Sequence, residues 1–151
     1  MQLKIPPLLL TALFATLAWA LAAVTPELTM TIPGREVVSH ALAICGAIIC
    51  GAAIVSFRRA RTTVNPTRPE QASSIVTTGV YAISRNPMYL GFLGLLVGWA
   101  IYLANAIVLI LVPIGFVAYL NRFQIRPEEE ALKSRFGAGF VAYAGRVRRW
   151  L

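Results

Sequence analysis

Four apolar runs divide this chain, at residues 8–24, 37–57, 88–104 and 106–120. A helix needs roughly 20 residues to cross the ~30 Å hydrocarbon core of a bilayer. The first two runs approach or reach that length. The last two are shorter, so we expect tilted helices or flanking side chains that reach the interface. The pattern predicts an all-α fold, a polytopic bundle of about four transmembrane helices.

Only Asn105 separates the last two runs, which must therefore form an antiparallel helical hairpin. Beyond residue 120, apolar residues recur at spacings of three and four among basic residues, as on one face of a helix. Pro127 suits the first position of that helix. We expect an amphipathic helix at the membrane interface with a bend near Gly137 and Gly139. Its apolar face comprises Leu132, Phe136, Phe140, Tyr143, Val147 and Trp150.

The basic residues indicate an orientation in the membrane. Thirteen of the 14 lysines and arginines fall at the amino terminus, in 58–85 or in 122–149, and Arg35 alone lies between the first two runs. The positive-inside rule then places both termini in the cytoplasm and residues 25–36 and Asn105 outside. This rule explains the net charge of +8 without a nucleic-acid partner.

The composition describes one membrane domain that covers residues 1–151. Hydrophobic residues make up 58% of the chain and charged residues 13%, against roughly 25% charged in soluble domains. Cys45 and Cys50 lie five apart within an apolar run, so we interpret them as packing residues and expect no metal site. His40 lies in the outer half of the second run, and we interpret it as a structural residue.

Two polar clusters flank the predicted hairpin. The first cluster precedes or begins the third run and comprises Arg85, Asn86, Pro87 and Tyr89. The second follows the fourth run, at residues 126–130, and includes the adjacent glutamates Glu128 and Glu129. An arginine can bind a carboxylate through two parallel hydrogen bonds. Alternatively, Arg85 is one of the basic residues that set the orientation of the helices in the membrane. The glutamates can hold an ammonium or a ribose diol, or simply complement a helix dipole. Because the hairpin returns the chain, both clusters lie on one membrane side, where they can form a pocket for a small zwitterionic cofactor.

The combined pattern is Gly79-x-Tyr81-x3-Arg85-Asn86-Pro87-x-Tyr89-x-Gly91, then the hairpin, then Glu128-Glu129 and a terminal Arg149. It resembles the isoprenylcysteine carboxyl methyltransferase and phospholipid N-methyltransferase superfamily of integral membrane enzymes over residues 60–151. The resemblance implies an S-adenosylmethionine-dependent methyltransferase that acts on a lipophilic or small acceptor, through a carboxylate, an amine or a thiol. It also implies a cofactor site built from the end of the third span, the fourth span and the carboxyl-terminal region. We expect an integral protein of a bacterial inner membrane, with the active site on the cytoplasmic side by the positive-inside rule.

The resemblance assigns roles to individual residues. The implied cofactor-binding residues are Tyr81, Arg85, Asn86, Pro87, Tyr89, Gly91, Glu128 and Glu129, and the implied catalytic residues are Glu128, Glu129 and Arg149. We expect Arg85 to meet the carboxylate of the cofactor and one glutamate to meet its ammonium.

One departure from the family pattern matters for the mechanism, and a second is Phe140, where a tyrosine is common. Many members have Arg-His-Pro where this chain has Arg85-Asn86-Pro87, and Asn86 cannot act as a base near neutral pH. Glu128 or Glu129 is then the best candidate base for an amine acceptor. Two other classes of function stay open: a non-enzymatic membrane protein that binds anionic lipid, and a membrane reductase with a nicotinamide cofactor.

Overall fold

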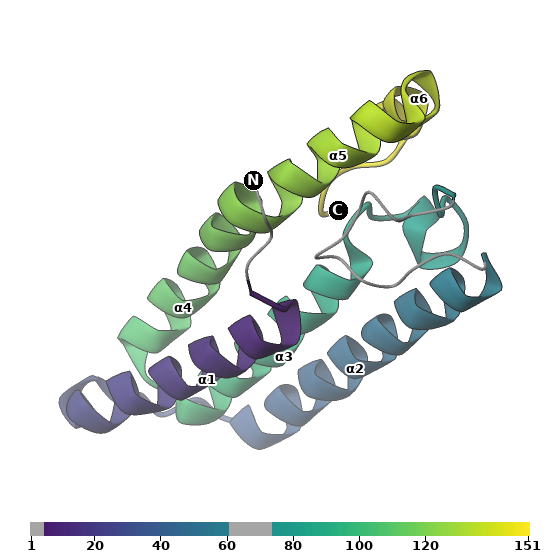
Figure 1. The fold of residues 1–151 in the computed structure, drawn as a ribbon. Helices are drawn as coiled ribbons and strands as arrows, with labels where there is room; N and C mark the ends of the chain where they lie inside the picture. The colour runs from purple at the N-terminus through teal and green to yellow at the C-terminus, as the bar shows by residue number, and fades with distance from the viewer. Residues whose placement is uncertain (1–4, 61–73) are drawn as a thin grey trace.

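The computed structural model describes residues 5–60 and 74–151, and it confirms the all-α prediction. Apart from one isolated β-bridge, the regular structure in these two ranges is helical. Short helical turns join the main helices (Figure 1). The bounds of the main helices are α1 Pro7–Val24, α2 Arg35–Arg59, α3 Pro87–Leu103, α4 Ala106–Tyr119, α5 Arg126–Phe136 and α6 Ala138–Arg146.

The helices have the length and surface of a membrane bundle. Three helical stretches are long and apolar enough to cross a bilayer, namely Pro7–Val24, Arg35–Arg59 and Ala106–Phe136, and α3 is a shorter apolar helix. Large side chains such as Leu17 and Ile48 are more than half exposed on the outside of the bundle. Such extensive apolar surface is unfavourable in water and favourable in lipid. The protein is therefore an integral membrane protein.

Helices α2 and α3 pack closely because glycines line their contact. A Cβ atom added to Gly46 would lie 2.6 Å from the carbonyl oxygen of Gly91. A Cβ added to Gly98 would lie 2.8 Å from the carbonyl oxygen of Ser39. Small residues at such positions let the backbones of membrane helices approach. The two helices run antiparallel, so the start of α3 lies beside the second half of α2.

The predicted hairpin turn at Asn105 is confirmed. Helix α3 ends at Leu103, and the Oδ1 atom of Asn105 accepts hydrogen bonds from the backbone N–H groups of Ile107 and Val108 at 3.1 and 3.2 Å. This capping satisfies two N–H groups that the first turn of α4 leaves without helical partners. The Nδ2 atom of Asn105 also donates to the carbonyl oxygen of Thr25 at 2.8 Å. The turn is thereby tied to the loop that follows α1.

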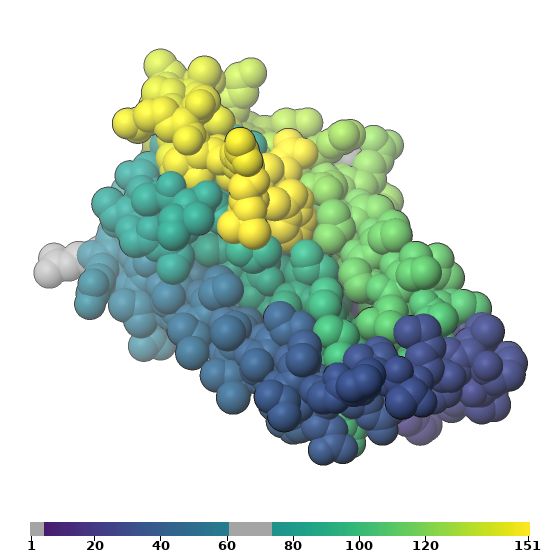
Figure 2. Space-filling model, turned by 180° about the vertical axis from the view of Figure 1, so that it is seen from behind, coloured from purple at the N-terminus to yellow at the C-terminus, as the bar shows by residue number. Residues whose placement is uncertain are grey.

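The carboxyl-terminal region folds back onto the bundle. Helix α4 continues through a π-helical segment, Leu120–Ile125, into α5, so that the three form one long rod (Figure 1). The predicted bend occurs at Gly137, whose φ of 51° separates α5 from α6. Helix α6 ends at Arg146, and Val147 is extended. Figure 2 shows the tail at the end of the bundle opposite the α1–α2 loop, against the segment before α3.

Candidate active site

The two polar clusters predicted from the sequence meet at one end of the bundle, with the carboxyl-terminal tail between them. The backbone N–H of Arg85 donates to the carbonyl oxygen of Arg148 at 3.0 Å. The Nδ2 atom of Asn86 donates to the carbonyl oxygen of Arg149 at 2.9 Å. Both bonds join the segment before α3 to the tail, more than 60 residues later in the chain. The tail therefore forms one wall of the site.

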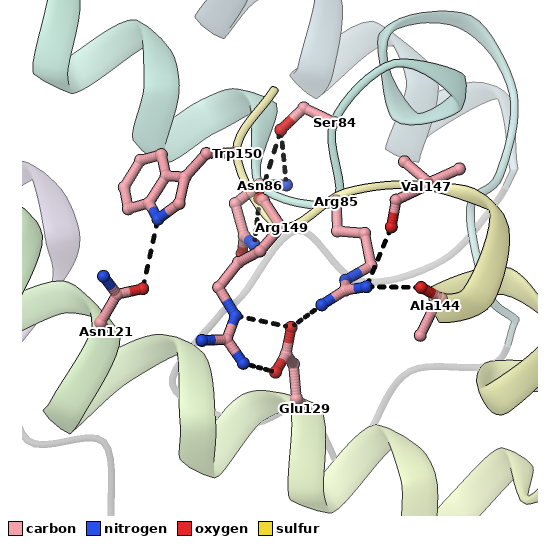
Figure 3. A network of polar contacts seen from close by, with 9 residues as sticks. All are labelled: Ser84, Arg85, Asn86, Asn121, Glu129, Ala144, Val147, Arg149 and Trp150. Atoms are coloured by element: carbon pink, nitrogen blue, oxygen red, sulfur yellow. Dashed lines mark hydrogen bonds and ion pairs between the residues drawn. The ribbon is translucent and has the colours of Figure 1, made fainter.

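Glu129 is held between two arginines (Figure 3). Its Oε1 atom lies 2.7 Å from Arg85 Nη2, and its Oε2 atom lies 2.6 Å from Arg149 Nη2. Arg149 Nε also donates to Oε1 at 3.2 Å, so that the guanidinium of Arg149 grips both carboxylate oxygens. Charge-assisted, two-point contacts of this kind fix geometry as well as charge. This cluster of Arg85, Glu129 and Arg149 is named the ion triad below.

Backbone carbonyl groups engage two further N–H donors of Arg85. Its Nη1 atom donates to the carbonyl oxygens of Ala144 and Val147 at 2.8 and 2.9 Å. Its Nε atom is buried and has no hydrogen-bond partner among the described residues. The structure thus places the guanidinium of Arg85 against the protein itself. Its role in this arrangement is to fasten the end of α6 and the tail to the start of α3.

The ion triad controls the ionisation of Glu129. Burial opposes the charged form, but hydrogen bonds from Arg149 and then Arg85 outweigh it, so that the pKa of Glu129 lies below its ordinary value. Glu129 is therefore an ionised carboxylate at neutral pH. Two positive charges surround this one negative charge, and the triad carries a net positive charge.

Glu128 has a different environment from its neighbour. It lies beyond the apolar part of the α4–α5 rod, and burial raises the pKa of its carboxyl to about 7, with the negative charge of Glu129 adding to the effect. A hydrogen bond from the Tyr89 hydroxyl to Oε2, at 3.0 Å, partly offsets this shift. The other oxygen, Oε1, receives no hydrogen bond from the described residues. Glu128 can thus exchange a proton near neutral pH and accept a further hydrogen bond.

Three of the predicted site residues serve as scaffold in this structure. Pro87 is buried as the first residue of α3. Gly91 faces α2, where an added Cβ would lie 2.5 Å from the sulfur of Cys50. The ring of Tyr81 packs edge-on against Phe57 with ring centroids 5.1 Å apart. These residues position the start of α3 rather than line a free surface.

Several contacts of the site could not be predicted from the sequence pattern. The hydroxyl of Ser84 accepts a hydrogen bond from the backbone N–H of Asn86 at 3.1 Å. Trp150 Nε1 donates to Asn121 Oδ1 at 3.2 Å, which fixes the tail on the π-helical segment (Figure 3). The acceptors that hold Arg85 are backbone carbonyl groups. Such groups leave no signature in the residue types, because every residue carries one.

The unengaged groups suit a zwitterionic ligand. Glu128 Oε1 offers an acceptor for an ammonium, and Arg149, with 34% of its side chain exposed, offers a guanidinium nitrogen that no described residue engages. Within 5–60 and 74–151, no group of three or more potential metal ligands occurs. The arrangement can bind opposite charges side by side and can move one proton, at Glu128.

Comparisons with known proteins relate the sequence to membrane methyltransferases. The family model described as phospholipid methyltransferase matches residues 35–139. The chain is 39% identical over 107 residues to protein-S-isoprenylcysteine O-methyltransferase B of Arabidopsis thaliana, covering 69% of this chain and 52% of the relative. It is 36% identical over 84 residues to the protein-S-isoprenylcysteine O-methyltransferase of Saccharomyces cerevisiae, covering 54% and 34%.

A shorter relative is matched over its whole length. An uncharacterized protein of Haemophilus influenzae is 42% identical over 64 residues, which are 42% of this chain and 100% of that protein. The chain spans about half or less of the two named methyltransferases, and no solved structure matches it. The family model covers more than half of the chain, including α2, α3, α4 and the paired glutamates. The chain therefore belongs to the phospholipid methyltransferase family.

Proposed function

We propose that the protein is an integral membrane methyltransferase that uses S-adenosylmethionine and methylates a lipophilic or small acceptor. The observation that carries this proposal is the meeting of Tyr89, Glu128 and the ion triad at one end of an apolar bundle. Membership of the phospholipid methyltransferase family supports the reaction class. The non-enzymatic and reductase alternatives have no such support.

In this proposal, different charged residues contact the ammonium and the carboxylate of the cofactor. Glu128 takes the ammonium, because its Oε1 atom is unengaged and its carboxylate form gains from a nearby cation. Arg149 takes the carboxylate, because part of its guanidinium is exposed and unengaged. Arg85, which the sequence pattern assigned to that carboxylate, instead positions Glu129 and the tail, since its Nη atoms are engaged within the protein.

The residues of the site supply alignment and proton transfer. S-adenosylmethionine, when bound, supplies an electrophilic methyl group on a sulfonium. A protein that holds an acceptor in line with such a group gains up to ~7–11 kcal/mol from orientation in favourable cases. Burial holds the pKa of Glu128 at about 7, and a bound ammonium would shift Glu128 toward the carboxylate form, which can take a proton from an amine acceptor. An acceptor that is already ionised, such as a carboxylate or thiolate, needs no base.

The position of the site suggests how acceptor and cofactor reach it. The site lies at the start of α5, where the apolar surface of the α4–α5 rod gives way to charged residues. We place this end on the cytoplasmic side of a bacterial inner membrane, with both termini, because the basic residues gather there. A lipophilic acceptor then enters from the bilayer, and the cofactor enters from the cytoplasm.

Ligand-dependent thermal unfolding separates the three classes of function. We expect S-adenosylmethionine and S-adenosylhomocysteine to raise the melting temperature of the detergent-solubilised protein and NADPH to leave it unchanged. A ligand at 100 times its Kd stabilises the folded state by about 2.7 kcal/mol. Stabilisation by NADPH alone would favour the reductase, and no stabilisation by any of the three at millimolar concentration would reject an enzyme of either class.

Transfer of a labelled methyl group identifies the acceptor. Membrane extracts incubated with the protein and methyl-labelled cofactor would yield a labelled lipid or small molecule. Alkali releases labelled methanol from a methyl ester but leaves an N-methyl or S-methyl product intact. With an amine acceptor, Glu128→Gln would remove the base and lower kcat. With a carboxylate or thiolate acceptor, the same change would mainly weaken cofactor binding and raise KM.

A further inference from the structure

A separate polar group, Glu36 and His40, lies at the opposite end of the bundle from the candidate active site. The start of α2 and the end of α3 flank an open surface hollow of about 570 Å³, lined by Glu36, His40, Ala43, Leu95, Trp99 and Tyr102 among others. Its α3 residues, Leu95 to Tyr102, lie about 12 to 22 Å from Pro87 along the helix, at 1.5 Å per residue. The hollow is therefore separate from the ion triad and from Glu128.

The hollow changes from polar to apolar with depth. Glu36 and His40 lie in the first turns of α2, and Ala43 lies about 10 Å from Glu36 along the same helix. Because α3 runs antiparallel, Leu95 lies deeper than Tyr102 by a similar amount. The hollow thus offers charge near the end of the helices and an apolar surface toward their middle. A lipid has the same order of polarity, from headgroup to acyl chain.

Aromatic rings form a firm wall of the hollow. The rings of Trp99 and Tyr102 are stacked, with centroids 5.6 Å apart and an interplanar angle of 12°. The ring of His40 meets Tyr102 edge-on at 6.4 Å. Trp99 is fixed because its Nε1 atom donates to the carbonyl oxygen of Ala15 at 3.0 Å. The faces of such rings attract cations.

The polar atoms of the hollow are mainly acceptors. His40 Nδ1 is hydrogen-bonded to the carbonyl oxygen of Glu36. Since a carbonyl oxygen can only accept, Nδ1 carries the proton, and Nε2 of the neutral ring is left as an acceptor. The carboxylate of Glu36 forms no salt bridge with the described residues. Two acceptors and an aromatic wall, with no lysine or arginine among the residues that line the hollow, suit a ligand that brings positive charge and N–H donors.

We propose that this hollow binds a membrane lipid whose headgroup carries a primary ammonium. The ammonium donates to the carboxylate of Glu36 and to His40 Nε2 beside the ring of Tyr102, and an acyl chain lies along Ala43 and Leu95. The lipid occupies the membrane face opposite the candidate active site. It is a bound structural lipid and not the methyl acceptor.

Native mass spectrometry of the detergent-solubilised protein tests this site with two lipids of equal acyl chains. We expect dioleoylphosphatidylethanolamine to bind more tightly than dioleoylphosphatidylglycerol. Glu36→Gln should weaken binding of the ethanolamine lipid about fivefold, and Tyr102→Leu about threefold, as expected for a partly exposed ion pair and cation–π contact. Glu27→Gln removes an equal charge from the neighbouring loop, outside the hollow, and should leave binding unchanged.

Three results would overturn the proposal. The first is equal affinity for the two lipids. The second is a Glu36→Gln protein that binds the ethanolamine lipid as well as the Glu27→Gln protein does. The third is displacement of that lipid by soluble phosphoethanolamine at equal concentration, because the apolar depth of the hollow would then contribute nothing.

Discussion

Replacing Glu129 with glutamine removes the negative charge that holds two arginines together. Arg85, whose side chain is 14% exposed, would then face a neutral amide and the positive charge of Arg149. Breaking a fully buried pair costs about 3–5 kcal/mol, and losing an exposed pair costs about 0–1 kcal/mol. The side chains of Arg85, Glu129 and Arg149 are 14%, 19% and 34% exposed, which is between fully buried and fully exposed. We therefore expect Glu129→Gln to cost about 1.5–3 kcal/mol.

This cost should fall on the docking of the tail. Arg85 Nη1 and the backbone N–H of Arg85 hold carbonyl groups between residues 144 and 148. When the triad is broken, the tail should open more often, and its amides should exchange hydrogen about tenfold to a hundredfold faster. Hydrogen exchange measured by mass spectrometry in detergent would follow peptides from residues 138–151 and, for comparison, from α2.

The matched control is Glu130→Gln, which removes an equal charge from the next, exposed position on α5. It should leave tail exchange close to that of the unmodified protein. Equal tail exchange in Glu129→Gln and Glu130→Gln would refute the structural role of the triad. Faster exchange throughout α2 as well as the tail would show general unfolding and refute the local mechanism.

Three further predictions concern proton binding, packing and orientation. The folded state raises the pKa of Glu128 from 4.5 to about 7 and so favours its protonated carboxyl. The contribution of this group to the unfolding free energy should therefore fall as the pH rises from about 4.5 to about 7. In thermal unfolding, Glu128→Gln should abolish that pH dependence. Gly46→Ala should lower the unfolding free energy by about 1–3 kcal/mol, since its Cβ would meet backbone at 2.6 Å. Gly51→Ala, with nothing within 4 Å of its added Cβ, should lower it little. Urea unfolding of both variants would show the difference, and equal losses of unfolding free energy would contradict the close packing of α2 and α3. In a cysteine-free background, an impermeant thiol reagent applied to intact cells should label cysteine at position 27 and not at position 133, and the reverse pattern would overturn the orientation.

The sequence pattern was sufficient to predict most of the helices. Apolar length marked the spans to within a few residues of α1 to α4, and Asn105 marked the hairpin turn because it is the single polar residue between two apolar runs. The break at Gly137 was also indicated, since glycine favours the positive φ found there. These features depend on local composition, which the chain displays directly.

The contacts of the site were less predictable for a physical reason. The pattern identified Arg85, Glu129 and Arg149, but not that they bind one another. An arginine placed to bind a ligand carboxylate and one placed to bind a glutamate have the same sequence signature. The difference depends on the path of the tail, whose backbone carbonyls attract Arg85. That path is set by tertiary packing, including the bond from Trp150 to Asn121.

The most direct test of the proposed function is calorimetric titration of the detergent-solubilised protein with S-adenosylhomocysteine. The proposed site predicts binding with a micromolar Kd. Glu128→Gln should weaken it about tenfold to a hundredfold, because one charge-assisted contact contributes about 1.5–3 kcal/mol, while Glu130→Gln should bind like the unmodified protein. Binding that Glu128→Gln leaves intact would place the cofactor elsewhere, and the absence of heat at millimolar ligand would contradict the methyltransferase proposal itself.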